Sequence, residues 1–185
     1  MKKSIITLVI SMVAMSSFAQ SKSIEPEYIG QVVILNADST TTLLQKETAK
    51  MKAKSSKWGM LPIPGAGMLD KSKVKLTIKG SEAPVKVKAG PLTLVIKTGN
   101  NEKDPKEVFG VWKLEVEKKA RTFLMAEAGF LSGVTATTNY NNVPFVAKKY
   151  GEGCYIIFFD NIEPGEYAVN TDFVNLSTFS VQQIV

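Results

Sequence analysis

Apolar and polar residues alternate along several stretches of the chain. Residues 73–79 and 112–117 each place an apolar side chain at every second position, with lysine, threonine or glutamate between. Residues 85–88 repeat the pattern over a shorter length. A period of two predicts half-buried β-strands that keep one face toward water.

Other stretches carry apolar residues at both odd and even positions, and therefore on both faces of a strand. Residues 29–35, 92–96 and 154–159 are of this kind, and the last has six apolar residues in a row. Such a run is typical of a strand that is covered on both faces. We therefore expect residues 154–159 to lie centrally in a sheet, and residues 36–39, Asn-Ala-Asp-Ser, to close a first hairpin.

Residues 42–54 allow two interpretations. Alanine and methionine alternate with lysine over residues 49–54, which favours a strand. Leucine, lysine, glutamate, alanine and methionine are also strong helix formers, so a helix is the alternative.

The strands are short and turns rich in glycine, proline and asparagine separate them. This pattern predicts an all-β chain, an immunoglobulin-like or related Greek-key antiparallel β-sandwich of roughly eight to ten strands. Cys154 is the single cysteine and lies in an apolar run, so we expect a buried thiol and no intramolecular disulfide.

The segment Ile162-Glu163-Pro164-Gly165-Glu166-Tyr167 follows the last apolar run. It is similar to the tyrosine corner of immunoglobulin-like sandwiches, where the tyrosine hydroxyl bonds back to the backbone upstream. With residues 143–167 as a whole, it resembles small exported β-sandwich proteins of Gram-negative bacteria that have no assigned function. The resemblance implies a fold and an exported location, and it implies no site residues.

The N-terminus predicts export. Met1-Lys2-Lys3 is followed by an apolar stretch over residues 5–15, and Ser17 and Ala19 fit a signal-peptidase site. We expect residues 1–19 to be a cleaved signal peptide and residues 20–185 to form a single β-sandwich domain in the periplasm or at the cell surface.

Composition narrows the chemistry. The chain contains no histidine, which excludes histidine-based triads and histidine-ligated zinc. Carboxylates cluster only around predicted turns, so we expect a protein that is not an enzyme and needs no cofactor. Arg121 is the only arginine against 22 lysines, which argues against a site that reads an anion by bidentate geometry.

Positive charge is concentrated in one part of the chain. Between Lys46 and Lys88 there are 11 lysines and three acidic residues, a net charge of +8. Lysines on one sheet face would attract an anionic glycan, lipopolysaccharide or a membrane surface. The alternative is a solvated face that discourages edge-to-edge pairing of strands.

An apolar segment interrupts this basic region at residues 58–69. It carries no charge and contains two prolines, which makes a long regular element improbable. It is either an exposed loop that meets a membrane or partner, or a plug over the core. Together the two features give the predicted binding residues: Lys50, Lys52, Lys54, Trp58, Leu61, Lys73 and Lys75.

The sequence thus predicts an exported, non-enzymatic binding or envelope-associated module that contacts an anionic glycan or lipid. A structural or assembly subunit that docks on other envelope proteins is the alternative. Nucleic acid is not expected as a partner, because an exported protein seldom meets it and arginine is scarce.

Overall fold

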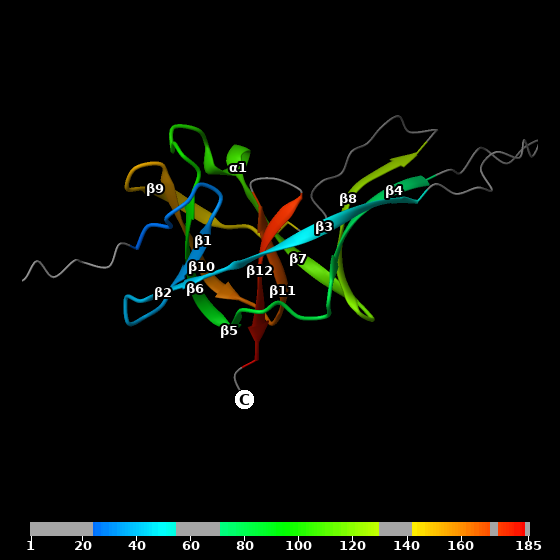
Figure 1. The fold of residues 1–185 in the computed structure, drawn as a ribbon, viewed down its shortest axis with the longest axis horizontal. Coiled ribbons are helices and arrows are strands. Elements are labelled where there is room, and N and C mark those ends of the chain that lie inside the picture. Colours follow the sequence, from blue (N-terminus) through cyan, green and yellow to red (C-terminus); the bar gives the residue numbers. More distant parts are fainter. Residues whose placement is uncertain (1–23, 55–70, 130–141, 171–173, 184–185) are drawn as a thin grey trace, which may run out of the picture.

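The computed structural model describes residues 24–54, 71–129, 142–170 and 174–183. Most of these residues form β-strands, and one short helix, α1 (Pro105–Val108), lies between β6 (Gly90–Lys97) and β7 (Gly110–Glu117) (Figure 1). The predicted all-β class is confirmed. The predicted signal peptide, residues 1–19, and the apolar segment, residues 58–69, lie outside the described residues.

Five strands form the first sheet, in the order β2-β1-β6-β10-β9, and every neighbouring pair is antiparallel. Their bounds are β1 (Val32–Leu35), β2 (Thr41–Leu43), β6 (Gly90–Lys97), β9 (Val146–Tyr150) and β10 (Cys154–Ile162). The apolar run at residues 154–159 lies in β10, between β6 and β9, which confirms its prediction as an internal strand. Cys154 is buried and free.

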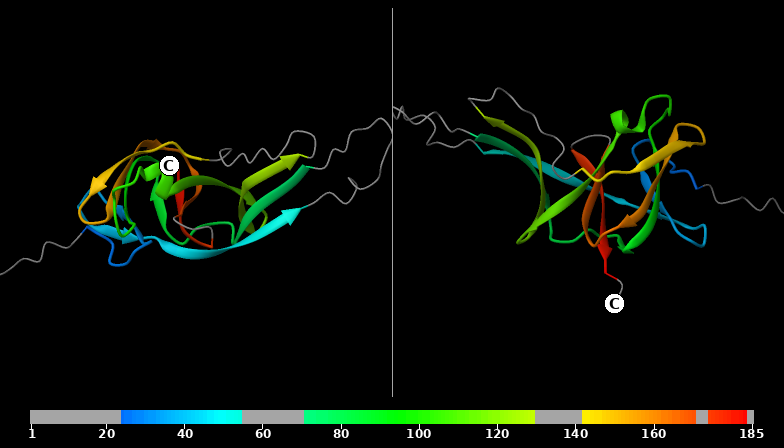
Figure 2. Two further views of the ribbon diagram at one scale, coloured as in Figure 1. Left: turned by 90° about the horizontal axis from the view of Figure 1, so that it is seen from above. Right: turned by 180° about the vertical axis from the view of Figure 1, so that it is seen from behind.

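Six strands close into a barrel, in the order β11-β7-β8-β4-β3-β12, because β12 pairs back onto β11. Their bounds are β3 (Gln45–Lys54), β4 (Lys71–Lys79), β7 (Gly110–Glu117), β8 (Ala120–Gly129), β11 (Gly165–Asn170) and β12 (Asn175–Gln182). A short strand, β5 (Lys86–Lys88), adds to β12 in parallel. Strands β3, β4 and β8 extend together beyond the rest of the barrel (Figure 2).

The two faces of strands β11 and β12 pack into two different hydrophobic cores. On β12, Phe179 and Val181 pack against the five-stranded sheet, whereas Leu176 packs with Leu76 and Phe123 inside the barrel. This division follows from the alternation of side chains along a strand. Strand β11 divides in the same way, so β11 and β12 belong to both cores.

The structure differs from the sequence prediction in the number of strands. The described residues contain 12 strands, more than the roughly eight to ten expected. Of the two interpretations of residues 42–54, the strand is confirmed, and Leu44 separates β2 from β3. The N–H of Leu44 donates to the carbonyl of Val32, at 2.9 Å, where the chain passes from the first sheet to the barrel.

Tyr167 makes the predicted corner hydrogen bond. Its hydroxyl donates to the backbone oxygen of Glu163 at 2.8 Å, and its ring stacks on Phe179 with 5.2 Å between the centroids. The bond fixes the crossing from β10 to β11, and therefore from the first sheet to the barrel. In the described part of the chain, no helix is long and apolar enough to span a membrane.

Candidate functional site

The β3–β4 ladder brings the predicted lysines together. In the antiparallel register Lys52 lies directly opposite Lys75, Lys54 lies opposite Lys73, and Lys50 lies opposite Thr77. Directly paired residues share a face of an antiparallel sheet, and alternate residues of one strand do as well. Five of the predicted binding positions therefore lie on one face of two neighbouring strands, which we call the lysine face.

Acidic residues border the lysine face on the side of β7 and β8. Lys75 Nζ lies 2.8 Å from Glu117 Oε1 on β7, and this hydrogen bond raises the pKa of Lys75. The register also places Lys73 opposite Glu127 on β8. Lys50 is exposed and forms no ion pair with a described residue. Of the two lysine-face side chains that the structure describes, Lys75 is therefore paired and Lys50 is not.

Two of the predicted binding residues, Trp58 and Leu61, lie outside the described residues. Of Lys52, Lys54 and Lys73 the structure describes only the backbone and its register.

The single arginine lies inside the barrel. Arg121 on β8 is fully buried, and its Nη2 donates to both carboxylate oxygens of Glu47 on β3, each at 2.8 Å. Its Nε donates to the backbone oxygen of Gly80 at 3.1 Å. Its Nη1 lies 3.6 Å from Glu166 Oε2 on β11 and has no hydrogen-bond partner among the described residues.

Strand β12 completes this buried cluster. The hydroxyl of Thr178 donates to Glu47, and the hydroxyl of Ser180 donates to Glu166. The N–H of Ala83 donates to Glu166 Oε2 at 2.8 Å. Carboxylates from two strands thus meet one guanidinium at the end of the barrel interior. From the sequence, Arg121 stands out only as the single arginine, because the residues that contact it are distant in the chain.

A hollow of about 710 Å³ opens where β9 leaves β10. Strand β9 pairs with β10 only as far as Phe158, which lies opposite Val146. The chain segment that precedes β9 contacts β7 instead of β10. There the N–H of Val143 donates to the Val111 oxygen at 2.8 Å. A register shift between Phe159 and Ile162 marks a β-bulge at the same place.

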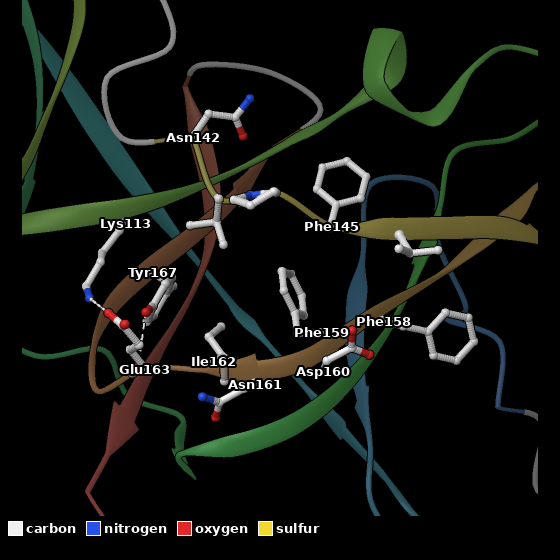
Figure 3. Close-up of a pocket in the computed structure, with 13 residues that line it drawn as sticks. Lys113, Asn142, Phe145, Phe158, Phe159, Asp160, Asn161, Ile162, Glu163 and Tyr167 are labelled. Atoms are coloured by element: carbon white, nitrogen blue, oxygen red, sulfur yellow. Dashed lines mark hydrogen bonds and ion pairs between the residues drawn. The ribbon is translucent and has the colours of Figure 1, made fainter.

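Both apolar and polar side chains line the hollow (Figure 3). The lining includes the aromatic residues Phe145, Phe158, Phe159 and Tyr167 and the polar residues Lys113, Asn142, Asp160, Asn161 and Glu163. Lys113 Nζ and Glu163 Oε2 form an ion pair at 3.1 Å, and this contact raises the pKa of Lys113. Burial raises the pKa of Tyr167. Asp160 and Glu163 belong to the carboxylates that the sequence places around predicted turns, and no sequence signal points to a hollow beside them.

No group of three or more cysteine, histidine or acidic residues in the described ranges could hold a metal ion. No protein-family model matches the chain, and a search of curated proteins finds no significant match. The function therefore has to be inferred from the geometry of the lysine face, the buried cluster and the hollow.

Proposed function

We propose that this protein is an exported, non-enzymatic binding module that contacts an anionic glycan, lipopolysaccharide or an anionic membrane surface through the lysine face. One observation carries the proposal: the register sets Lys52 opposite Lys75 and Lys54 opposite Lys73. Like charges directly opposite one another destabilise a sheet. A bound anion would relieve that repulsion.

The placement of Arg121 supports the same proposal. The only arginine is buried with Glu47, so lysines are the cationic side chains that can contact an anion at the surface. Lysine ammoniums act as point charges without the planar fork that selects one anion by shape. We therefore expect weak binding with broad specificity for negatively charged surfaces.

We also propose that the fold is of the immunoglobulin-like class. This proposal is supported by the hydrogen bond of Tyr167 to the backbone of Glu163 and by two facing layers of antiparallel strands. The closed barrel is an elaboration that this class does not require.

Vesicle binding tests the proposed function. The purified protein should sediment with vesicles that contain anionic phospholipid or lipopolysaccharide at low salt, and should not sediment with neutral phosphatidylcholine vesicles. Binding should weaken as salt rises, because the Debye length falls from about 10 Å at 0.1 M to about 3 Å at 1 M. If no anionic surface binds at low salt, docking on another envelope protein becomes the better proposal.

A further inference from the structure

The hollow beside β10 contains none of the residues of the lysine face. Its floor is the C-terminal part of β10, where the described residues Phe159–Ile162 have no strand partner on the β9 side. Bulges and interrupted pairing of this kind commonly re-aim side chains beside binding sites.

An aromatic wall is held in place on one side. Phe145 is half-buried and stacks on Phe109, with ring centroids 5.4 Å apart and an interplanar angle of 20°. Phe109 is itself buried and packs edge-on against Tyr155, with centroids 5.6 Å apart. Figure 3 shows Phe145, Phe159 and Tyr167 arranged around the hollow. The Phe145 ring is therefore positioned before any ligand arrives, which lowers the ordering cost of binding.

Polar groups at the rim are free to bind. Asp160, Asn161 and Asn142 are exposed, and their side chains make no hydrogen bond or ion pair to another described residue. By contrast, Glu163 is already paired with Lys113. One carboxylate and two carboxamides thus offer both donors and acceptors beside apolar rings.

The charge of the residues that line the hollow limits which ligands can bind there. Asp160 and Glu163 outnumber Lys113, so the hollow carries a net negative charge and disfavours anions. The volume of about 710 Å³ lies within the roughly 300–1,000 Å³ of small-ligand sites. Sugars match this lining, because their hydroxyls bind carboxylates and amides while their C–H faces pack on aromatic rings.

We propose that this hollow binds a neutral saccharide of a few sugar units, with Asp160 as the main hydrogen-bond acceptor and Phe145 as the stacking ring. A purely apolar ligand would leave Asp160 and the two asparagines unused and would bury them without partners. An extended peptide would find only a four-residue free edge on β10. A saccharide uses both kinds of side chain.

Titration by NMR tests the proposal. The full chain, labelled with ¹⁵N, would be titrated with neutral trisaccharides (maltotriose, cellotriose, mannotriose and N,N′,N″-triacetylchitotriose) up to about 10 mM, enough to detect a Kd near 1 mM. At least one should shift amide signals within residues 142–146 and 158–163. Acidic oligogalacturonate should shift them less.

Two variants sharpen the test. Asp160→Ala should weaken saccharide binding roughly tenfold or more, the loss expected for a hydrogen bond to a charged group. Glu152→Ala removes another exposed carboxylate, on the turn before β10, and should leave the affinity unchanged. Because Asp160 is exposed, its replacement should preserve the fold, which the unaltered remainder of the NMR spectrum would verify.

The proposal is overturned if no neutral trisaccharide shifts the signals around the hollow, if the shifts lie elsewhere, or if Asp160→Ala binds as tightly as the unmodified chain. Stronger binding of the acidic oligosaccharide at the hollow would overturn it as well. None of these results depends on the lysine face, so the proposed function and this site can fail separately.

Discussion

At the level of single residues, Arg121 links strands β8, β3 and β11 at one end of the barrel through its contacts with two carboxylates. It is the only arginine, it is fully buried, and it contacts carboxylates that come from β3 and β11. Breaking a buried ion pair by removing one partner leaves charge without compensation and is strongly destabilising. We infer that Arg121 serves the fold and takes no part in binding at the surface.

The variant Arg121→Met should therefore lower the free energy of unfolding by about 3–5 kcal/mol, because Glu47 and Glu166 lose their counter-charge. Urea denaturation measures the effect. The triple variant with Glu47→Gln and Glu166→Gln should recover part of the lost stability, since the neutral amides need no counter-charge and their oxygens can still accept from Thr178, Ser180 and the N–H of Ala83. A single variant as stable as the unmodified chain would contradict this account.

Tyr167 is the second residue on which the fold depends. Tyr167→Phe should cost about 1–3 kcal/mol, because it removes the hydrogen bond between the hydroxyl of a buried tyrosine and the Glu163 carbonyl. Tyr155→Phe is the matched comparison, because it removes the same kind of hydrogen bond in the first sheet. The Tyr155 hydroxyl donates to the Lys103 backbone oxygen at 2.7 Å. If Tyr167→Phe left stability unchanged, the corner hydrogen bond would not support the fold.

The contribution of Tyr167 to the stability of the fold should decrease at high pH. Burial raises the pKa of Tyr167 above the ordinary value of 10.0, so the folded state keeps the phenol proton that the unfolded state has lost. Stability from this group is complete below pH 10 and is lost as the pH rises through the folded pKa. Denaturation at pH values above 10 should show a shallower decline for Tyr167→Phe than for the unmodified chain. Equal slopes would show that Tyr167 titrates as it does in the unfolded state.

At the scale of elements, β3 and β4 supply the lysines while β7 and β8 supply the acids beside them. Glu117 on β7 takes up part of the charge of Lys75 across the sheet surface. Exposed pairs of this kind are weak, about 0.2–1 kcal/mol, because water and salt screen them. An incoming anion can therefore displace the carboxylate from Lys75.

Removing that competition should strengthen binding. Glu117→Gln should raise the affinity for anionic vesicles about two- to fivefold, as expected when a weak competing pair is lost. Glu102→Gln changes the charge equally in the loop before α1, away from the lysine face, and should alter affinity less. Equal gains in the two variants would mean that net charge alone decides binding and that the lysine face has no special part.

Sequence patterns predicted single strands better than their arrangement. The continuous apolar run of β10 and the alternation of β4 are local signals, and both strands formed as expected. Alternation also placed Lys50, Lys52 and Lys54 on one strand face, but it could not tell that β4 would be their neighbour. The Arg121 cluster and the hollow depend on barrel closure and on β9 leaving β10, which are set by contacts distant in sequence.

At the scale of the whole molecule, the barrel and the five-stranded sheet share their core. Strands β11 and β12 bury one face against the sheet and the other inside the barrel. Residues of both sheets also mix in one apolar cluster that includes Leu94, Ile157 and Phe179. We therefore expect the two layers to unfold together.

Two substitutions test this expectation. Leu76→Ala inside the barrel and Leu94→Ala between the layers each remove a side chain that is at most 1% exposed, and each should cost about 2–5 kcal/mol. In both variants, fluorescence and circular dichroism should follow the same single transition in urea. Separate transitions for the two probes would show that the layers unfold independently.

A comparison of two charge-matched variants tests whether the lysine face binds anionic surfaces, as we propose. One variant changes Lys50, Lys52, Lys73 and Lys75 to Gln, and the other changes Lys88, Lys103, Lys106 and Lys149, which are exposed on other parts of the molecule. Each lysine near an anionic leaflet contributes up to about 1 kcal/mol, so the first variant should lose at least about tenfold in affinity for anionic vesicles and most of its salt dependence. The second should lose much less. Equal losses, or none in the first variant, would contradict the account.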